Sequence, residues 1–298
     1  MLRERLEGKT LALICLCYGF WGFLVFGPTY VPIWLSVPLL IPLLAFHSSL
    51  QHECIHGHPF MIGELNDLIA FIPIGIFLPY PRYKENHLIH HQKASISDPV
   101  EDPESWYLTR EKWSRLPASL RMLLNANNTL IGRLILGPAI GMVSLVLSDF
   151  EKLRAGRHDL LATWASHAIL CFLLLLAIAS WSSISVATYL VCAYCGMSIL
   201  MIRTFLEHQA HKDMRGRSVL IEDKGPLRLL FLNNNLHAVH HAYPAVAWYR
   251  LPVIFKLHRE RFLQMNRGYH YKSYGDIFRT FTFTRKEPVV YPLDRSGP

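Results

Sequence analysis

The chain has 298 residues, of which 51% are hydrophobic and only 17% are charged, and its mean hydropathy is +0.21. This composition is too apolar for an ordinary soluble domain and indicates a protein of the lipid bilayer. The formal net charge is +8, from 30 Lys and Arg against 22 Asp and Glu. A basic face against anionic lipid headgroups accounts for this charge, so we expect no nucleic-acid partner.

Two long stretches without Lys or Arg, residues 10–81 and 158–202, mark the membrane-embedded part of the chain. Each stretch contains a pair of apolar runs near the roughly 20 residues that a helix needs to cross a bilayer. Gly27-Pro28 separates the first pair and Ser182-Ser183 the second, which predicts two helical hairpins. The four expected transmembrane helices are residues 10–26, 31–50, 160–181 and 184–202.

Two further apolar stretches, residues 65–80 and 131–147, are shorter and interrupted by Pro and Gly. We expect them to be re-entrant or to lie at the membrane interface. Pro38 and Pro42 predict a kink in the second expected helix, which a membrane helix tolerates when its neighbours satisfy the freed carbonyl groups.

The positions of the basic residues predict the orientation of the chain. All Lys and Arg lie before residue 10, between 82 and 157, or from 203 onward, and the turns of the two hairpins carry none. By the positive-inside rule, both termini and the loops should be cytoplasmic. We therefore expect an all-α integral membrane protein, a single domain over residues 1–298, with a cytoplasmic helical cap formed by about 82–157 and 203–298. Its expected location is a bacterial cytoplasmic (inner) membrane, with the active site on the cytoplasmic side.

Three histidine clusters lie just outside the apolar runs: His52-Glu-Cys-Ile-His56, His87-Leu-Ile-His90-His91 and His237-Ala-Val-His240-His241. On a helix, residues four apart differ by about 40° around the axis, and adjacent residues by about 100°. Adjacent histidines therefore point more easily at two ions than at one, which suits a dinuclear metal centre in the cap. The six isolated histidines are interpreted as packed or solvated side chains: His47, His58, His158, His167, His258 and His270.

Neutral imidazole binds zinc, copper, nickel and iron alike, so the spacing alone does not name the metal. Apart from Cys54, no Cys lies near the clusters, and this scarcity of Cys argues against a structural zinc site. His208 and His211, after the fourth run, are further candidate ligands. Polar residues close to the clusters in sequence are candidates to hydrogen-bond the imidazoles; they are Glu53, Asp98, Glu207 and the run Asn233-Asn234-Asn235.

The three clusters, the last within residues 235–244, resemble the histidine boxes of the membrane fatty acid desaturase superfamily in order and separation, and the resemblance covers about residues 10–251. It implies a non-haem centre of two Fe ions that activates O2 as co-substrate and attacks a C–H bond of a lipid chain. The implied metal ligands, which are also the implied catalytic residues, are His52, His56, His87, His90, His91, His208, His237, His240 and His241. His208 is preferred to His211 because residues 203–208 are similar to the position of an additional ligand in that family. Residues 98–106 resemble an acidic loop after the second box, where a turn is the favoured role over a catalytic one.

The leading function is O2-dependent fatty acyl desaturation in lipid metabolism. A lipid or carotenoid hydroxylase or ketolase on the same scaffold is the alternative, since residues 244–252 resemble the segment after the third box in both groups. A metal-transport or metal-sensing membrane protein is the remote alternative, but it would need ionisable residues along a path through the bilayer, where the expected helices offer only His47 and His167. The expected partners are a lipid substrate, the membrane and an external electron donor such as ferredoxin or a cytochrome, because no haem-binding or rubredoxin-like motif is evident.

Overall fold

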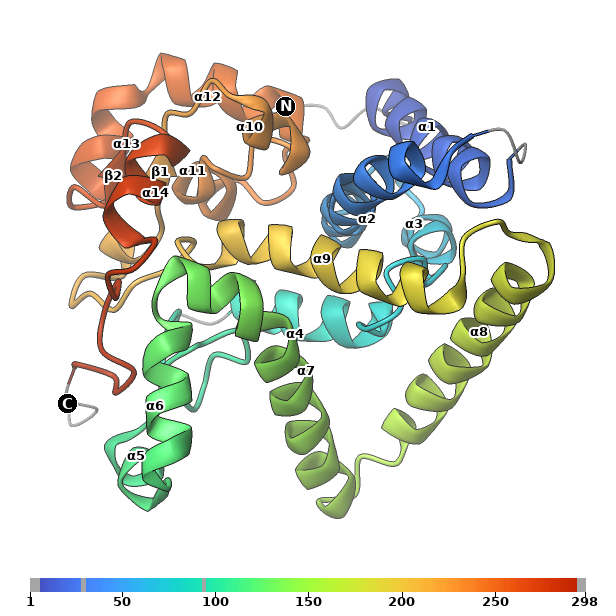
Figure 1. Cartoon of the computed structure of the whole chain (residues 1–298). Coiled ribbons are helices and arrows are strands. Elements are labelled where there is room, and N and C mark those ends of the chain that lie inside the picture. Colours follow the sequence, from blue (N-terminus) through green and yellow to red (C-terminus); the bar gives the residue numbers. More distant parts are fainter. Residues whose placement is uncertain (1–5, 28–30, 93–94, 294–298) are drawn as a thin grey trace. The chain divides into compact units, whose positions relative to one another are not determined.

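The structure is a computed structural model that describes residues 6–27, 31–92 and 95–293 (Figure 1). Helices make up most of it, which confirms the expected helical class. The long helices are α1 (Gly8–Phe26), α2 (Ile33–Ile55), α4 (Tyr80–Gln92), α7 (Leu130–Arg154), α8 (Asp159–Trp181) and α9 (Val186–Thr204). The shorter α-helices are α3 (Gly63–Ala70), α5 (Arg110–Arg115), α6 (Ala118–Asn127), α10 (Pro226–Leu230), α11 (His237–Ala242), α12 (Leu251–Leu257), α13 (Arg259–Met265) and α14 (Tyr274–Phe281). Two 3-10 helices, η1 (Met214–Arg217) and η2 (Trp248–Arg250), and two parallel strands, β1 (Leu220–Ile221) and β2 (His270–Tyr271), complete it.

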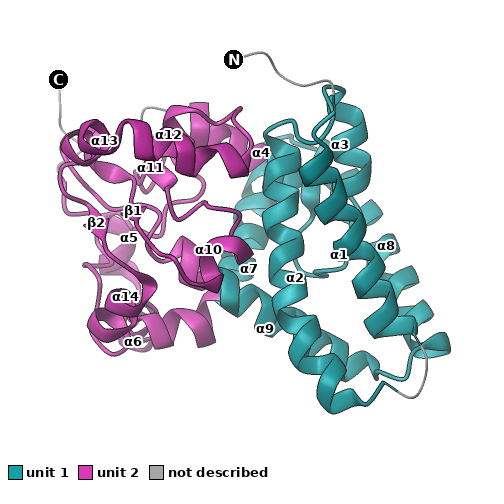
Figure 2. Cartoon of the chain, turned by 90° about the horizontal axis from the view of Figure 1, so that it is seen from above, with its two compact units in different colours: residues 1–84, 138–200 teal, residues 85–137, 201–298 magenta. Residues whose placement is uncertain are grey.

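The chain forms two compact units, coloured separately in Figure 2. Unit 1 comprises residues 1–84 and 138–200, and unit 2 comprises residues 85–137 and 201–298. The boundaries fall inside α4, α7 and α9, so each of these helices contributes to both units.

Within the described part of the chain, five helices are long and apolar enough to cross a membrane: α1, α2, α7, α8 and α9. Four of them coincide with the expected transmembrane helices, and α7 is additional. Gly137, Pro138 and Gly141 made this stretch look interrupted in the sequence, but α7 continues through Pro138. The part of the connecting turn at residues 28–30 lies outside the described residues.

The surface of α8 shows why these helices belong in lipid. Phe172, Leu173, Leu176 and Trp181 are all more than half exposed. A helix that is apolar all round and still exposes large side chains has no favourable surroundings in water. The chain is therefore a membrane protein on both composition and structure.

The core of unit 1 forms where α1 packs along α2 and both meet α9. A methyl group in place of the Gly196 hydrogen would lie 3.1 Å from the Leu44 side chain and 3.2 Å from the Ile41 carbonyl oxygen. Glycine at this position therefore lets α9 approach α2 closely. Leu40 and Tyr189, both fully buried, belong to the same core.

Between α3 and α4 the chain runs without a helix through residues 71–79, and side chains of the long helices bond to two of its carbonyl groups. The Tyr189 hydroxyl donates to Ile74, and His167 Nε2 donates to Ile76, each at 2.7 Å. Irregular backbone among apolar helices is stable only when its polar groups are paired in this way. Residues 65–80, expected to be re-entrant or interfacial, thus consist mainly of the end of α3 and this irregular stretch.

A buried ion pair anchors the first turn of α4 in unit 1. The Arg82 guanidinium donates two hydrogen bonds to the Asp149 carboxylate, at 2.8 and 2.7 Å, and both residues are 1% exposed. The indole of Trp164 on α8 donates a third bond to Asp149 at 2.9 Å. Because an unpaired buried charge is costly, this network fixes where α4 begins.

Unit 2 has a separate core beneath β1. Apolar side chains of α11, α12 and α13 pack there around Leu220 of the strand, and Val239 of α11 is fully buried among them. β1 pairs in parallel with β2, with Leu220 opposite His270. This packing holds the short helix α11, which carries the third histidine cluster.

Candidate metal centre

Four imidazoles from three elements converge inside unit 2. His90 comes from α4 and His208 from the irregular segment after α9, while His237 and His241 are four residues apart on one face of α11. Each offers one ring nitrogen, and these atoms all lie within 4.8 Å of one another. We call these four residues group A.

The spacing of the group A nitrogens fits a shared metal ion. His208 Nε2 lies 2.9 Å from both His90 Nε2 and His237 Nε2. His241 Nε2 lies 3.3 Å from His90 Nε2 and 3.1 Å from His237 Nε2. Two nitrogens at right angles around one ion, with metal–nitrogen bonds of roughly 2.1 Å, would be about 3 Å apart. The donor set therefore fits a metal without rearrangement of the side chains.

Hydrogen bonds to the far side of the rings fix which nitrogen carries the proton. His90 Nδ1 donates to Asp102 Oδ1 at 2.9 Å, and His237 Nδ1 donates to Asn234 Oδ1 at 2.9 Å. The Asn234 amide is oriented in turn, because its Nδ2 donates to Glu207 Oε1 at 3.1 Å. Because these bonds occupy the Nδ1 atoms, the converging Nε2 atoms of both rings are the ones that a metal would take, in place of any proton that they carry.

Burial and charge favour metal binding at group A. Burial lowers the pKa values of His208, His237 and His241 well below the usual 6.5, so these rings are neutral at physiological pH. Burial also lowers the pKa of His90, but Glu104, Asp102 and Glu207 together raise it to about 9. The negative potential that draws a proton to His90 equally draws a metal cation.

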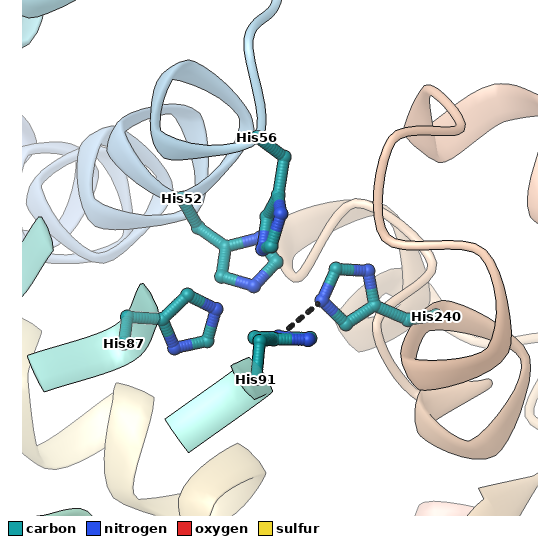
Figure 3. A group of neighbouring side chains, drawn as sticks. All are labelled: His52, His56, His87, His91 and His240. Carbon is teal, nitrogen blue, oxygen red and sulfur yellow. Dashed lines mark hydrogen bonds between the residues drawn. The ribbon is translucent and has the colours of Figure 1, made fainter. Parts of the chain in front are cut away.

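A second set of imidazoles in unit 2 consists of His87, His91 and His240, which we call group B (Figure 3). His91 Nε2 lies 3.2 Å from His240 Nε2, and the His87 and His91 ring centroids are 4.6 Å apart. Burial, with the neighbouring His87 and His90, lowers the pKa of His91 to about 3. Each H-x-x-H-H motif thus divides its adjacent histidines between the groups: His90 and His241 in group A, His91 and His240 in group B.

The remaining two predicted ligands belong to unit 1. His52 lies in the last turn of α2, and His56 caps the C-terminal end of that helix. Their ring centroids are 4.7 Å apart, and both rings project from the end of the helix (Figure 3). The expected i, i+4 pair is therefore formed.

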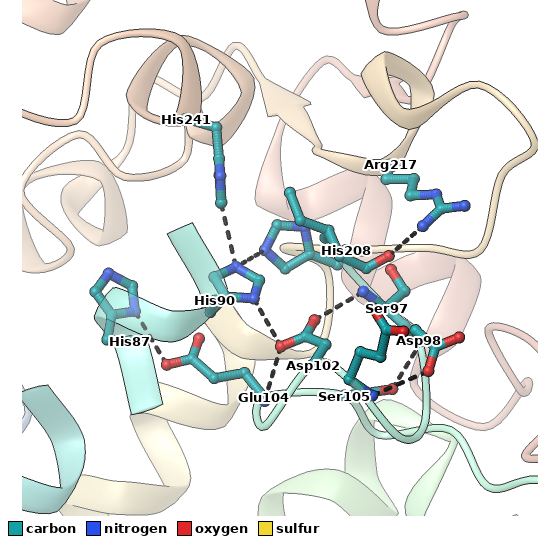
Figure 4. A network of polar contacts seen from close by, with 12 residues as sticks. His87, His90, Ser97, Asp98, Asp102, Glu104, Ser105, His208, Arg217 and His241 are labelled. Carbon is teal, nitrogen blue, oxygen red and sulfur yellow. Dashed lines mark hydrogen bonds and ion pairs between the residues drawn. The ribbon is translucent and has the colours of Figure 1, made fainter. Parts of the chain in front are cut away.

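Residues 97–105, which include most of the acidic loop, supply two imidazole partners, Asp102 and Glu104, that were not among the predicted ones (Figure 4). Asp102 binds His90, and Glu104 Oε1 accepts from His87 Nδ1 at 3.0 Å. Asp102 Oδ2 also accepts from the backbone N–H of Ser97 at 2.7 Å, which closes the loop. Burial raises the pKa of Glu104, but the surrounding histidines, His87 first, lower it to about 2. The signal in the sequence was an acidic run a few residues after the second cluster.

The other predicted partners have different roles. Asp98 Oδ1 accepts from the N–H groups of Val100 and Glu101 within the loop. Glu207 Oε1 lies 3.7 Å from His237 Nδ1, and Glu53 Oε1 lies 3.8 Å from His52 Nδ1.

The structure also shows where the Asn run and His211, the second candidate histidine after α9, lie. Asn234 orients His237, whereas Asn233 and Asn235 donate to the carbonyl groups of Trp248 and Ile221. His211 Nδ1 lies 2.9 Å from the carbonyl oxygen of Asp213. The structure thus places His208, and not His211, in group A.

Four of the isolated histidines have partners outside the two groups, in agreement with their interpretation as packed or solvated side chains. His47 Nε2 lies 2.9 Å from the Tyr18 hydroxyl, and His167 binds the Ile76 carbonyl group. The other two contact carboxylates, His58 with Glu7 at 3.0 Å and His270 with Glu222 at 2.8 Å.

In a comparison with known families, the family model described as fatty acid desaturase matches residues 28–273, which is most of the chain. A comparison with curated proteins found no match. The matched range contains all the residues of groups A and B, together with His52 and His56.

Proposed function

Since the chain belongs to the fatty acid desaturase family, we propose that it is an oxygen-dependent desaturase that introduces a double bond into a lipid acyl chain. The observation that carries the proposal is the pair of converging imidazole groups, whose adjacent histidines separate into two sets as two ions require. Its reaction class, lipid oxidation, follows from the family; the metal, the reaction and the substrate are our assignments.

We assign one iron ion to each group. Group A provides His90, His208, His237 and His241. Group B provides His87, His91 and His240, and we propose that His52 and His56 complete this set, as the resemblance of their cluster to a histidine box of the family implies. An all-imidazole set with carboxylate partners on the outer nitrogens is compatible with iron. These irons, when bound, would activate O2 and supply the oxidant for an unactivated C–H bond.

The protein's own residues prepare this chemistry. Asp102, Glu104 and Asn234 hold the rings with the ligand nitrogens inward, so no rotation of the rings is needed when a metal binds. The burial of His87, His90 and His237 excludes water from the nitrogens. Exclusion of water protects a reactive oxidant from side reactions.

The balance of the reaction requires an electron donor. Conversion of –CH2–CH2– to –CH=CH– releases two electrons and two protons, whereas reduction of O2 to two water molecules takes four of each. The other two electrons must come from an external carrier, for which we propose ferredoxin or a cytochrome, and the other two protons from water. The basic composition of the chain favours an acidic carrier by electrostatic steering.

We further propose that both groups lie on the cytoplasmic side of a bacterial inner membrane. The support is the distribution of Lys and Arg, which are missing from residues 10–81 and 158–202 and frequent elsewhere. A cytoplasmic site would be accessible to soluble electron carriers.

Mass spectrometry of lipids and carotenoids tests the function. Cells expressing the chain should contain acyl chains that have lost two hydrogens, and cells with an empty vector or the His90→Ala variant should not. A gain of one oxygen in acyl chains or carotenoids would instead identify a hydroxylase or ketolase. Unchanged lipids in cells that contain the iron-loaded protein and a reductase system would contradict the proposal.

A further inference from the structure

The ligand candidate His208 lies on backbone that is not helical. Residues 205–211 follow α9 in an irregular conformation, so their polar backbone groups need partners from elsewhere in the fold. Within unit 2, five of these groups are bonded to residues distant in sequence. The bonds are Tyr269 Oη to Leu206 O at 2.5 Å, Val219 N to Glu207 O at 3.1 Å, Lys286 Nζ to His208 O at 2.5 Å, Ser97 Oγ to Gln209 O at 2.9 Å, and Ala210 N to Tyr107 Oη at 2.7 Å.

Lys286 is the unusual member of this set. Its side chain is 7% exposed, yet its ammonium donates to the His208 carbonyl group and pairs with Glu287 Oε1 at 3.0 Å. The ammonium also lies 5.6 Å from the centroid of the Tyr269 ring. Burial lowers the pKa of Lys286, and Glu287 opposes this effect. A buried ammonium is retained only where its hydrogen bonds offset the cost of leaving water.

The segment that carries Lys286, residues 286–291, is itself fixed in place, and we call it the C-terminal strap. The backbone N–H of Lys286 donates to the Asn128 carbonyl group at 2.9 Å, and Asn128 Nδ2 donates to the Glu287 carbonyl group at 3.0 Å. Further along, Leu108 exchanges backbone hydrogen bonds with Val289 and Tyr291, both at 2.9 Å. Besides its contact with His208, the strap is therefore bonded to two other segments of unit 2.

Tyr107 closes the network. Its hydroxyl donates to the Glu287 carboxylate and accepts from the backbone N–H of Ala210. Glu287 thereby joins Tyr107 to Lys286. Lys286 holds the carbonyl group of His208, and Tyr107 holds the amide of Ala210, two residues further along. Both side chains contact Glu287, so they act as one hydrogen-bonded network.

We propose that Lys286 and Tyr107 are positioning residues that fix the backbone of His208 and so set the affinity and geometry of the metal at group A. The inference rests on the proposed function, because it takes His208 to be a metal ligand. The strap lies beyond residue 273, where the family match ends, and Lys286 bonds to the backbone carbonyl group of His208.

Replacement of Lys286 by Met tests this directly. Lys286→Met keeps the aliphatic stem but leaves the His208 carbonyl group without the ammonium. We expect the affinity for one of two iron ions to fall by on the order of 10- to 100-fold, the range seen when partners of metal ligands are removed. Tyr107→Phe, which keeps the ring and removes the hydroxyl, should weaken the same ion. Lys272→Met, at an exposed lysine, is the matched control.

The measurement uses the full chain in detergent, loaded with iron-57, with affinity from chelator competition and Mössbauer spectra of each variant. The proposal expects the signal of one iron to shift or disappear in Lys286→Met while the other keeps its wild-type parameters, and no change in Lys272→Met. If Lys286→Met does not yield folded protein, Tyr107→Phe decides by the same criterion, with faster hydrogen exchange at residues 206–210 as its second expected result.

Two results would overturn this inference but not the proposed function. The first is that folded Lys286→Met and Tyr107→Phe proteins bind two irons at wild-type affinity. The second is that these variants lose both irons equally, which would indicate a general effect on the fold. A wild-type protein that binds no iron would overturn the proposed function together with it.

Discussion

Replacement of Asp102 by Asn should weaken metal binding at group A while leaving the fold intact. Asp102 is 6% exposed and accepts from three donors: the ring of His90, and the N–H groups of Glu104 and Ser97. One carboxylate oxygen serves His90 and Glu104, and the other serves Ser97. In the Asp102→Asn variant one of these oxygens is replaced by an NH2 group, so a donor faces a donor whichever way the amide is turned.

The magnitude follows from the kind of bond that is lost. A hydrogen bond to a charged group contributes about 1.5–3 kcal/mol. At about 1.4 kcal/mol for each tenfold change in an equilibrium constant, the expected loss is roughly 10- to 100-fold in metal affinity. Loss of a ligand's outer partner typically has the same effect, about 10- to 100-fold.

Competition with a chelator for iron(II), measured on purified protein, gives this affinity. Glu101→Gln is the control, because it removes an exposed carboxylate from the same loop and should bind iron as the wild type does. An Asp102→Asn protein within about twofold of the wild-type affinity would refute the argument that Asp102 orients His90 for metal binding.

Three further predictions follow. His241→Ala removes one of the four group A nitrogens, so lipid turnover should vanish while expression and the thermal midpoint in detergent stay near wild type; substantial activity in the variant would remove His241 from the ligand set. Arg82→Met leaves the buried Asp149 carboxylate without its guanidinium, which should lower the free energy of unfolding by about 3–5 kcal/mol and the thermal midpoint by several degrees. Arg157→Met, in the exposed pair with Asp159, should leave the midpoint unchanged. Equal midpoints in the two variants would show that the buried pair does not hold α4. Single cysteines at Glu101 and Lys272 should react with an impermeant reagent only from the cytoplasm, and one at Ser183 only from the opposite side; reaction of the Glu101 cysteine in intact cells would contradict the assigned orientation.

The sequence was most informative where local geometry determines the outcome. The spacing of His237 and His241 predicts a shared face, and α11 places both rings in group A. The apolar runs likewise predicted four helices of membrane length, because hydrophobic length is itself the physical requirement. The fifth, α7, was missed because Pro138 usually ends a helix in water, but not in a membrane environment.

The partners of the imidazoles were harder to predict. Asp102 lies 12 residues from His90, and only the folding of the acidic loop brings them together. Lys286 lies 78 residues from His208, and its contact is with the backbone, so no residue pattern near the histidine could indicate it. Contacts of this kind depend on tertiary packing, which local periodicity does not encode.

The number of iron ions bound per chain tests the central claim most directly. After iron-replete expression and anaerobic purification, the wild-type protein should hold two irons per chain, and His208→Ala should hold one. A wild-type protein with well under two irons under these conditions, or one whose iron content is unchanged when His90 and His91 are both replaced by Ala, would contradict a di-iron centre built from groups A and B.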